Sequence, residues 1–175
     1  MNTFKIIFSY DYASKLISIG WKDLIFAIDH GFMAQESLIE YAIHLVNTEL
    51  EPAQIVIDIA CLNKGDSIYP YLDKLKIETG NKNGKEPCNK FLYLLLNWVY
   101  THKESYSDPF DVVEVIYGDF DYPEEIAGFV RYMPTAEPVY QSLQLNRERM
   151  YRNWEQYLKE QRAKYSLAGN LRGES

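Results

Sequence analysis

Acidic side chains are concentrated in one segment of the sequence, residues 104–137. The segment holds nine carboxylates and a single cation, Arg131, so its formal charge is −8. The nine are Glu104, Asp108, Asp111, Glu114, Asp119, Asp121, Glu124, Glu125 and Glu137. Carboxylates gathered on one surface attract a basic partner, and they raise the association rate and fix the docking register more than they add affinity. The first hypothesis is therefore a binding surface for a basic protein.

Seven residues of this segment are the candidates for contact with that partner. Asp111 and Glu114 are three residues apart, which puts them on one face of a helix that begins near Pro109. Aromatic residues stand beside the acids in the sequence, and aromatic side chains are enriched at the centres of interfaces. The predicted partner-binding residues are Asp111, Glu114, Asp119, Phe120, Asp121, Tyr122 and Glu125.

Two other interpretations of the same carboxylates stay open. Asp and Glu are common at helix N-termini because they offset the positive end of the helix dipole, and Asp108, Glu124 and Glu125 fit that structural role. The run DFDYPEE also crowds carboxylates as a divalent metal site does, which makes a metal-dependent hydrolase using the 119–125 carboxylates the alternative function. The run does not match the EF-hand loop, because the required Gly and the closing Glu are missing.

The familiar motifs of catalysis and nucleotide binding are absent. No GxxxxGK[ST], GxGxxG, GxSxG or HExxH pattern occurs. None of the three histidines, His30, His44 and His102, has a second histidine within four residues. Cys61 and Cys88 form no CxxC motif, and both are predicted to be reduced. The sequence predicts a non-enzymatic protein with no catalytic residues, no metal ligands and no cofactor.

The composition excludes several classes of protein. The chain has 175 residues, a net charge of −7 and 15% aromatic residues, so a globular protein is expected and a disordered one is excluded. A negative surface argues against binding to nucleic acid or to an anionic membrane. No apolar run reaches the length of about 18 residues that spans a bilayer, and the first residues lack the pattern of a secretory signal. We therefore expect a cytoplasmic protein with no nucleic-acid and no membrane partner.

Helix start and stop patterns divide the chain into helix-length segments and predict an all-α fold, a compact domain of about seven or eight helices. The clearest start is Asp108 followed by Pro109, an N-cap and a first-turn proline that open the helix carrying the first candidate carboxylates. Residues 91–100, FLYLLLNWVY, predict a helix that is buried on nearly every side. The short run 4–10 fits a strand and a helix equally well.

The last part of the sequence predicts one long helix, because roughly thirty residues pass without Gly or an internal Pro. An apolar stripe along this helix also offers a seam for a homodimeric regulatory or structural protein, although the arginines at 147, 149 and 152 interrupt it. The predicted organisation is a helical core at 1–137, a long helix at 138–166 packed on the core or extending from it, and a flexible tail at 167–175.

Parts of the sequence resemble a bacterial family known as domain of unknown function 2247. The run DPFDVVEVIYGDFDYPEEIAGFVRYMP at 108–134, preceded by KFLYLLLNWVY at 90–100, contains the DFDYP and YMP pieces that make the likeness specific. GWKDLIFAIDHGFM is similar to the family's opening helix, so the likeness covers residues 18–135. The resemblance assigns no catalytic residues. It implies a small cytosolic protein similar in style to immunity proteins, with a cognate toxin as the basic partner.

Overall fold

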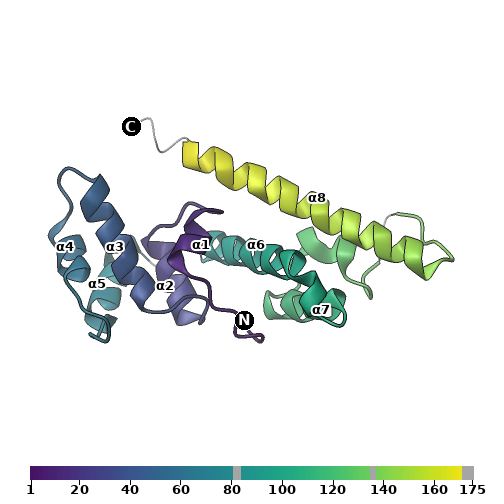
Figure 1. Ribbon diagram of the computed structural model, residues 1–175, viewed down its shortest axis with the longest axis horizontal. Helices are drawn as coiled ribbons and strands as arrows, with labels where there is room; N and C mark the ends of the chain where they lie inside the picture. The colour runs from purple at the N-terminus through teal and green to yellow at the C-terminus, as the bar shows by residue number, and fades with distance from the viewer. Residues whose placement is uncertain (81–83, 135–136, 171–175) are drawn as a thin grey trace. The chain divides into compact units, whose positions relative to one another are not determined.

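A computed structural model describes residues 1–80, 84–134 and 137–170, with side chains as far as Ser166 (Figure 1). Eight α-helices and two 3-10 helices make up the secondary structure of these residues, which contain no β-strand, so the predicted all-α fold with a long C-terminal helix is confirmed. The ambiguous run 4–10 forms neither element: Phe8 makes one isolated parallel bridge with Met33, and α1 begins only at Tyr10. No helix within the described ranges is both long enough and apolar enough to span a bilayer.

Contacts divide the chain into two compact units. The N-terminal unit comprises Lys5–Asn89, and the C-terminal unit comprises Lys90–Ser175 together with Met1–Phe4. The boundary falls inside helix α6 (Lys85–Thr101), which therefore contributes to both units.

Short helices build the N-terminal unit. They are α1 (Tyr10–Ser14), α2 (Trp21–Asp29), α3 (Glu36–Thr48), α4 (Gln54–Ala60) and α5 (Tyr69–Thr79). Helix α3 packs against α4 and α1, and α2 packs against α5. Local sequence sets both ends of α2: the backbone N–H of Gly20 donates to the Asp23 carboxylate at 2.9 Å, and Gly31 takes the left-handed conformation (φ 72°) just past the end.

The C-terminal unit is organised around one buried indole. Its elements after α6 are the 3-10 helix η1 (Lys103–Ser105), α7 (Pro109–Asp119), the 3-10 helix η2 (Glu124–Phe129) and α8 (Leu143–Asn170), the long helix labelled in Figure 1. Trp154 of α8 is fully buried, and its ring centroid lies 5.2 Å from that of Tyr100 on α6. The centroids of Phe110 on α7 and Phe129 on η2 lie 5.8 and 5.7 Å from it. Trp154 therefore joins four elements.

The local signals on α6 and α7 are confirmed. Residues Phe91–Leu96 are all buried, as expected for a helix that is apolar on nearly every side. Asp108 caps α7 and Pro109 is its first residue. The apolar residues of α7 that recur at helical spacing are buried: Phe110, Val113, Ile116 and Tyr117.

Helix α8 begins at Leu143, later than the predicted start at residue 138. The side-chain amide of Asn146 accepts from the backbone N–H of Tyr140 at 2.9 Å and donates to its C=O at 2.6 Å, which holds the preceding residues in a non-helical turn. Asn side chains compete with the helical backbone in this way and favour helix ends. Most of the predicted flexible tail, 167–175, lies outside the described residues. Residues after Asn170 are not described, nor are the side chains from Leu167 on.

Most of the apolar stripe on α8 is used inside the C-terminal unit. Met150, Trp154 and Tyr157 are buried, whereas Leu143 and Leu145 at the start of the helix are exposed. The homodimer through 138–166 stays a prediction, and within the described side chains Leu143 and Leu145 are the large apolar residues of this helix that are exposed.

The central place of Trp154 leads to a stability prediction. Replacing it with Ala removes the ring that four elements share, and we expect the free energy of unfolding to fall by about 3–5 kcal/mol. Leu143→Ala on the same helix is the matched control, because Leu143 is 88% exposed and should change the value by less than about 0.5 kcal/mol. Urea denaturation measures both variants, and equal losses would contradict the proposed role of Trp154.

Candidate functional site

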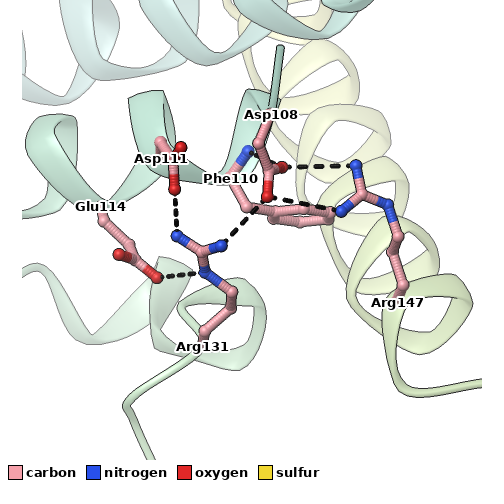
Figure 2. A network of polar contacts seen from close by, with 6 residues as sticks. All are labelled: Asp108, Phe110, Asp111, Glu114, Arg131 and Arg147. Carbon is pink, nitrogen blue, oxygen red and sulfur yellow. Dashed lines mark hydrogen bonds and ion pairs between the residues drawn. The ribbon is translucent and has the colours of Figure 1, made fainter. Parts of the chain in front are cut away.

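Asp111 and Glu114 share one face of α7, as predicted, and both carboxylates bind Arg131 (Figure 2). The Nε of Arg131 donates to Oε1 of Glu114 at 2.6 Å, and its Nη2 donates to Oδ1 of Asp111. Its Nη1 donates to Oδ2 of Asp108 at 3.0 Å, so a single guanidinium binds three carboxylates. The hydrogen bonds that Arg131 donates to Glu114 and Asp111 raise the pKa of Arg131 above its ordinary value.

Asp108 connects this cluster to the start of α7 and to α8. Its Oδ1 accepts from the backbone N–H of Phe110 at 3.1 Å, which is the predicted N-cap bond. The same oxygen accepts from Nη2 of Arg147 at 3.3 Å, and the Arg147 guanidinium lies 5.2 Å from the centroid of the Phe110 ring. Burial opposes ionisation of Asp108, but the Phe110 N–H and the Arg147 and Arg131 guanidiniums outweigh it and lower the pKa of this carboxyl.

The cluster neutralises much of the negative charge that the sequence places on α7. Three carboxylates and two guanidiniums leave a net charge of −1, where the three acids alone would carry −3. Charge counted along the chain misses this pairing, because Arg147 lies outside the acidic segment and the position of Arg131 depends on the fold. Asp111 and Glu114 are therefore less available to a partner than the sequence predicts.

Asp119 and Phe120, at the end of α7, are also engaged within the C-terminal unit. The Asp119 carboxylate accepts from the backbone N–H of Thr3 at 2.9 Å and from its hydroxyl at 2.8 Å. These bonds attach Met1–Phe4 to the end of α7 and explain why this short segment belongs to the C-terminal unit. The Phe120 side chain is only 6% exposed, so in this conformation it packs inside the unit.

Asp121 and Tyr122 form a turn with an unusual backbone. Their φ angles, 60° and 57°, lie in the left-handed region that favours glycine. The N–H of Asp121 donates to the C=O of Gly118 at 3.2 Å, and the N–H of Tyr122 donates to the C=O of Tyr117 at 2.9 Å, which closes α7. Left-handed backbone costs roughly 1–2 kcal/mol at each residue other than glycine, and such strain is concentrated at functional sites.

The exposed side chains around this turn combine acids with tyrosines. The carboxylates of Asp121, Glu124 and Glu125 are exposed and, in the part of the chain that the structure describes, form no ion pair. Tyr122 and Tyr132 are 62% and 58% exposed, although both rings pack against the buried ring of Tyr117 at 5.3 and 6.1 Å. We call this surface the acidic–aromatic turn: Asp121, Tyr122, Glu124, Glu125 and Tyr132.

Two members of the acidic–aromatic turn, Glu124 and Tyr132, were not among the predicted binding residues. Both lie in the acidic segment 104–137, so that segment was the right part of the sequence in which to look for them. Their exposure and their common support on Tyr117 follow from the turn after α7, which the sequence pattern does not show. Three of the seven predicted residues, Asp121, Tyr122 and Glu125, lie in this surface.

The 119–125 carboxylates do not converge on a common point. Asp119 is bonded to Thr3, whereas Asp121 and Glu125 are exposed. Among the described residues, no group of three His, Cys, Asp or Glu side chains lies close enough together to hold a metal ion.

A family model matches residues 10–162 of the sequence. The chain belongs to DUF2247, an uncharacterized protein family conserved in bacteria. The DUF2247 match includes the acidic–aromatic turn and continues beyond the likeness at 18–135, so most of the long helix α8 belongs to the family region. No curated protein and no solved structure matches the chain.

The lowered pKa of Asp108 makes stability depend on pH. In an unfolded chain this carboxyl has a pKa of about 3.9, and in the folded protein its pKa is lower. Its pairing therefore stabilises the fold above the unfolded pKa, and the stabilisation is lost as the pH falls through the folded pKa. We expect Asp108→Asn to lower the free energy of unfolding by about 1 kcal/mol at pH 7 and by much less near pH 2.

Urea denaturation across this pH range measures the effect. Asn is as good an N-cap as Asp, so Asp108→Asn tests the charge alone, whereas Asp108→Ala also removes the cap and should cost about 1 kcal/mol more. A difference between wild type and Asp108→Asn that stays constant with pH would contradict the role of the charge.

The left-handed backbone at Asp121 predicts an unusual order of substitutions. Asp121→Gly should leave the free energy of unfolding unchanged or raise it by up to about 1 kcal/mol, and Asp121→Val should lower it by at least about 1 kcal/mol. Asp73, exposed within α5, is the control, because Gly in a helix interior costs about 1 kcal/mol. If Gly destabilised both positions equally, the turn would not be strained.

Proposed function

We propose that this member of DUF2247 is a non-enzymatic protein that binds a basic partner protein through the acidic–aromatic turn. The observation that carries the proposal is three exposed carboxylates, which form no ion pair within the described residues, close in the chain to two exposed tyrosines whose rings pack on the buried ring of Tyr117. Unpaired acids attract a basic surface over several ångströms, and the tyrosines supply contact area once the partner arrives.

The tyrosines suit the role of anchors because their positions are already restricted. Tyr122 is fixed by the left-handed turn, and its ring meets Tyr117 edge to face. Tyr132 directly follows Arg131, whose three carboxylate partners hold that part of the chain against α7. A side chain that is ordered before binding loses less conformational entropy when the complex forms. Tyr is among the residues that most often dominate binding energy.

The partner that we propose is a toxin, which this protein would neutralise in the bacterial cytoplasm as immunity proteins do. Toxin domains that cleave nucleic acid need a basic cleft to hold phosphates. A rigid turn bearing Asp121, Glu124 and Glu125 presents negative charges to such a cleft, so it would compete with nucleic acid for the same surface.

The first experiment is an affinity capture from bacterial lysate with the tagged full-length protein, read by mass spectrometry. The capture is done at low salt and at about 500 mM salt, because the higher concentration screens exposed charges. We expect a basic protein that is lost at high salt. A partner that is retained equally at both concentrations would contradict the electrostatic part of the proposal.

The captured partner then permits a kinetic test. Glu124→Lys/Glu125→Lys should slow association at least about tenfold at low salt, while Tyr132→Ala should mainly speed dissociation. Glu104→Lys on η1 is the matched control for the single reversal Glu125→Lys, since Glu104 is exposed in the same acidic segment but outside the turn. An equal effect of Glu104→Lys and of Glu125→Lys would place recognition in the overall charge instead of the turn.

A further inference from the structure

Helix α3 in the N-terminal unit exposes an apolar stripe. Ile39, Ile43 and Val46 follow the i, i+4, i+7 spacing that places side chains on one helical face. Ile43 and Val46 are 44% and 37% exposed, and Ile39 is half-buried. Leu50, just beyond the helix, is fully exposed. A single exposed aliphatic residue needs no explanation, but an aligned row on one helix does.

The other faces of α3 already have neighbours. Leu38 and Ala42 are fully buried in the unit. Tyr41 and His44 lie beside Tyr10 of α1, with ring centroids 6.1 and 6.5 Å from it. The helix therefore has a face buried against its neighbours in the unit, and its exposed residues are the apolar stripe and the polar residues beside it, Glu40, His44, Asn47 and Thr48.

The part of the chain that forms α3 and α4 carries acids and no Lys or Arg. Between Lys22 and Lys64 the sequence has seven acids and no Lys or Arg. Two of the acids are used locally, Asp23 at the start of α2 and Asp29 in an ion pair with Lys76 at 2.9 Å. The other five form no ion pair within the described ranges: Glu36, Glu40, Glu49, Glu51 and Asp58. Glu36 and Glu40 are one helical turn apart on α3, and they border the stripe on one side.

One end of the stripe opens into a hollow of about 130 Å³. Ile39 contributes to its lining together with Ile68 and two carboxylates, Glu36 and Asp66. The Asp66 carboxylate also accepts from the backbone N–H of Asn63 at 2.7 Å, which fixes its position. The hollow thus offers an apolar wall and negative charge at the end of an apolar row.

We infer that the α3 stripe is a docking site for a basic amphipathic helix of a partner protein. Ile39 to Val46 spans about 10 Å along the axis, or two turns, which matches the i, i+3, i+4 anchors that a helix presents to a groove. A Lys or Arg side chain of the partner enters the hollow between Glu36 and Asp66. Glu36 and Glu40 along one side of the stripe, with Asp66 in the hollow, select a basic helix and repel an acidic one or an anionic membrane.

This docking site lies in the N-terminal unit and does not rest on the proposed function of the acidic–aromatic turn. A test that uses defined peptides keeps the two apart. The probe is a fluorescent peptide of Leu and Lys at helical spacing, and its matched controls carry Glu in place of every Lys or Gln in place of every Leu. Fluorescence anisotropy with the full-length protein measures binding of each peptide.

We expect the Leu/Lys peptide to bind and both control peptides to bind at least about tenfold more weakly. Ile43→Gln/Val46→Gln should weaken binding by a similar factor, because Gln keeps the helix propensity and removes the apolar contact. Ile77→Gln on α5 is the matched control, since Ile77 is 81% exposed on another helix, and it should leave binding unchanged. Glu36→Gln/Glu40→Gln should weaken binding and reduce its salt dependence.

Three results would overturn the inference. The first is binding that survives Ile43→Gln/Val46→Gln in a variant whose circular dichroism melt shows a folded protein. The second is binding that is lost in Glu124→Lys/Glu125→Lys but kept in the α3 variants, which would assign the peptide to the acidic–aromatic turn. The third is a dimer in light scattering that Ile43→Gln/Val46→Gln converts to a monomer, which would give the stripe to a second copy of this chain.

Discussion

The C-terminal unit depends on the burial of Trp154. Its ring meets side chains from α6, α7 and η2, so the three elements keep their positions only while the indole stays between them. Phe129, which stacks on Trp154, is the last residue of η2, and Glu124 and Glu125 are the first two. The exposed acids Glu124 and Glu125 therefore lie on a short 3-10 helix whose other end is held by the contact between Phe129 and Trp154. This buried aromatic contact gives the two surface charges a defined position.

The charge cluster on α7 lies at the edge of the same aromatic core. Phe110 contacts Trp154 on one side, and Arg147 lies over the Phe110 ring. Each ion pair in the cluster is partly exposed, so each is worth about 1 kcal/mol or less. Its larger effect is positional, because the planar guanidinium of Arg131 bonds in fixed directions and holds the residues after η2 against α7. The cluster uses the acids of α7 internally and leaves those beyond α7 for solvent.

The sequence predicts the parts of this structure that depend on neighbours in the chain. The start of α7 follows from Asp108 and Pro109, and the burial of α6 follows from its unbroken apolar run. Contacts between distant residues are not predictable in this way: Thr3 and Asp119 are 116 positions apart, and Arg147 reaches Asp108 from another helix. The neighbouring aromatics Phe120 and Tyr122 look equivalent in the sequence, yet one is buried and the other exposed. The left-handed turn between them decides the difference, and no glycine marks it.

Each unit carries acids that form no ion pair within the residues that the structure describes, but the apolar residues beside those acids differ. The acidic–aromatic turn sets carboxylates next to tyrosines on a strained turn, whereas the α3 stripe sets them next to aliphatic side chains on a regular helix. Electrostatic attraction alone would favour any basic partner at either surface, since it acts at long range and without shape. Selection between partners then depends on the short-range contacts, and these differ between rings held on Tyr117 and a row of Ile and Val. The two proposed sites would therefore attract basic partners alike and distinguish between them through different apolar contacts.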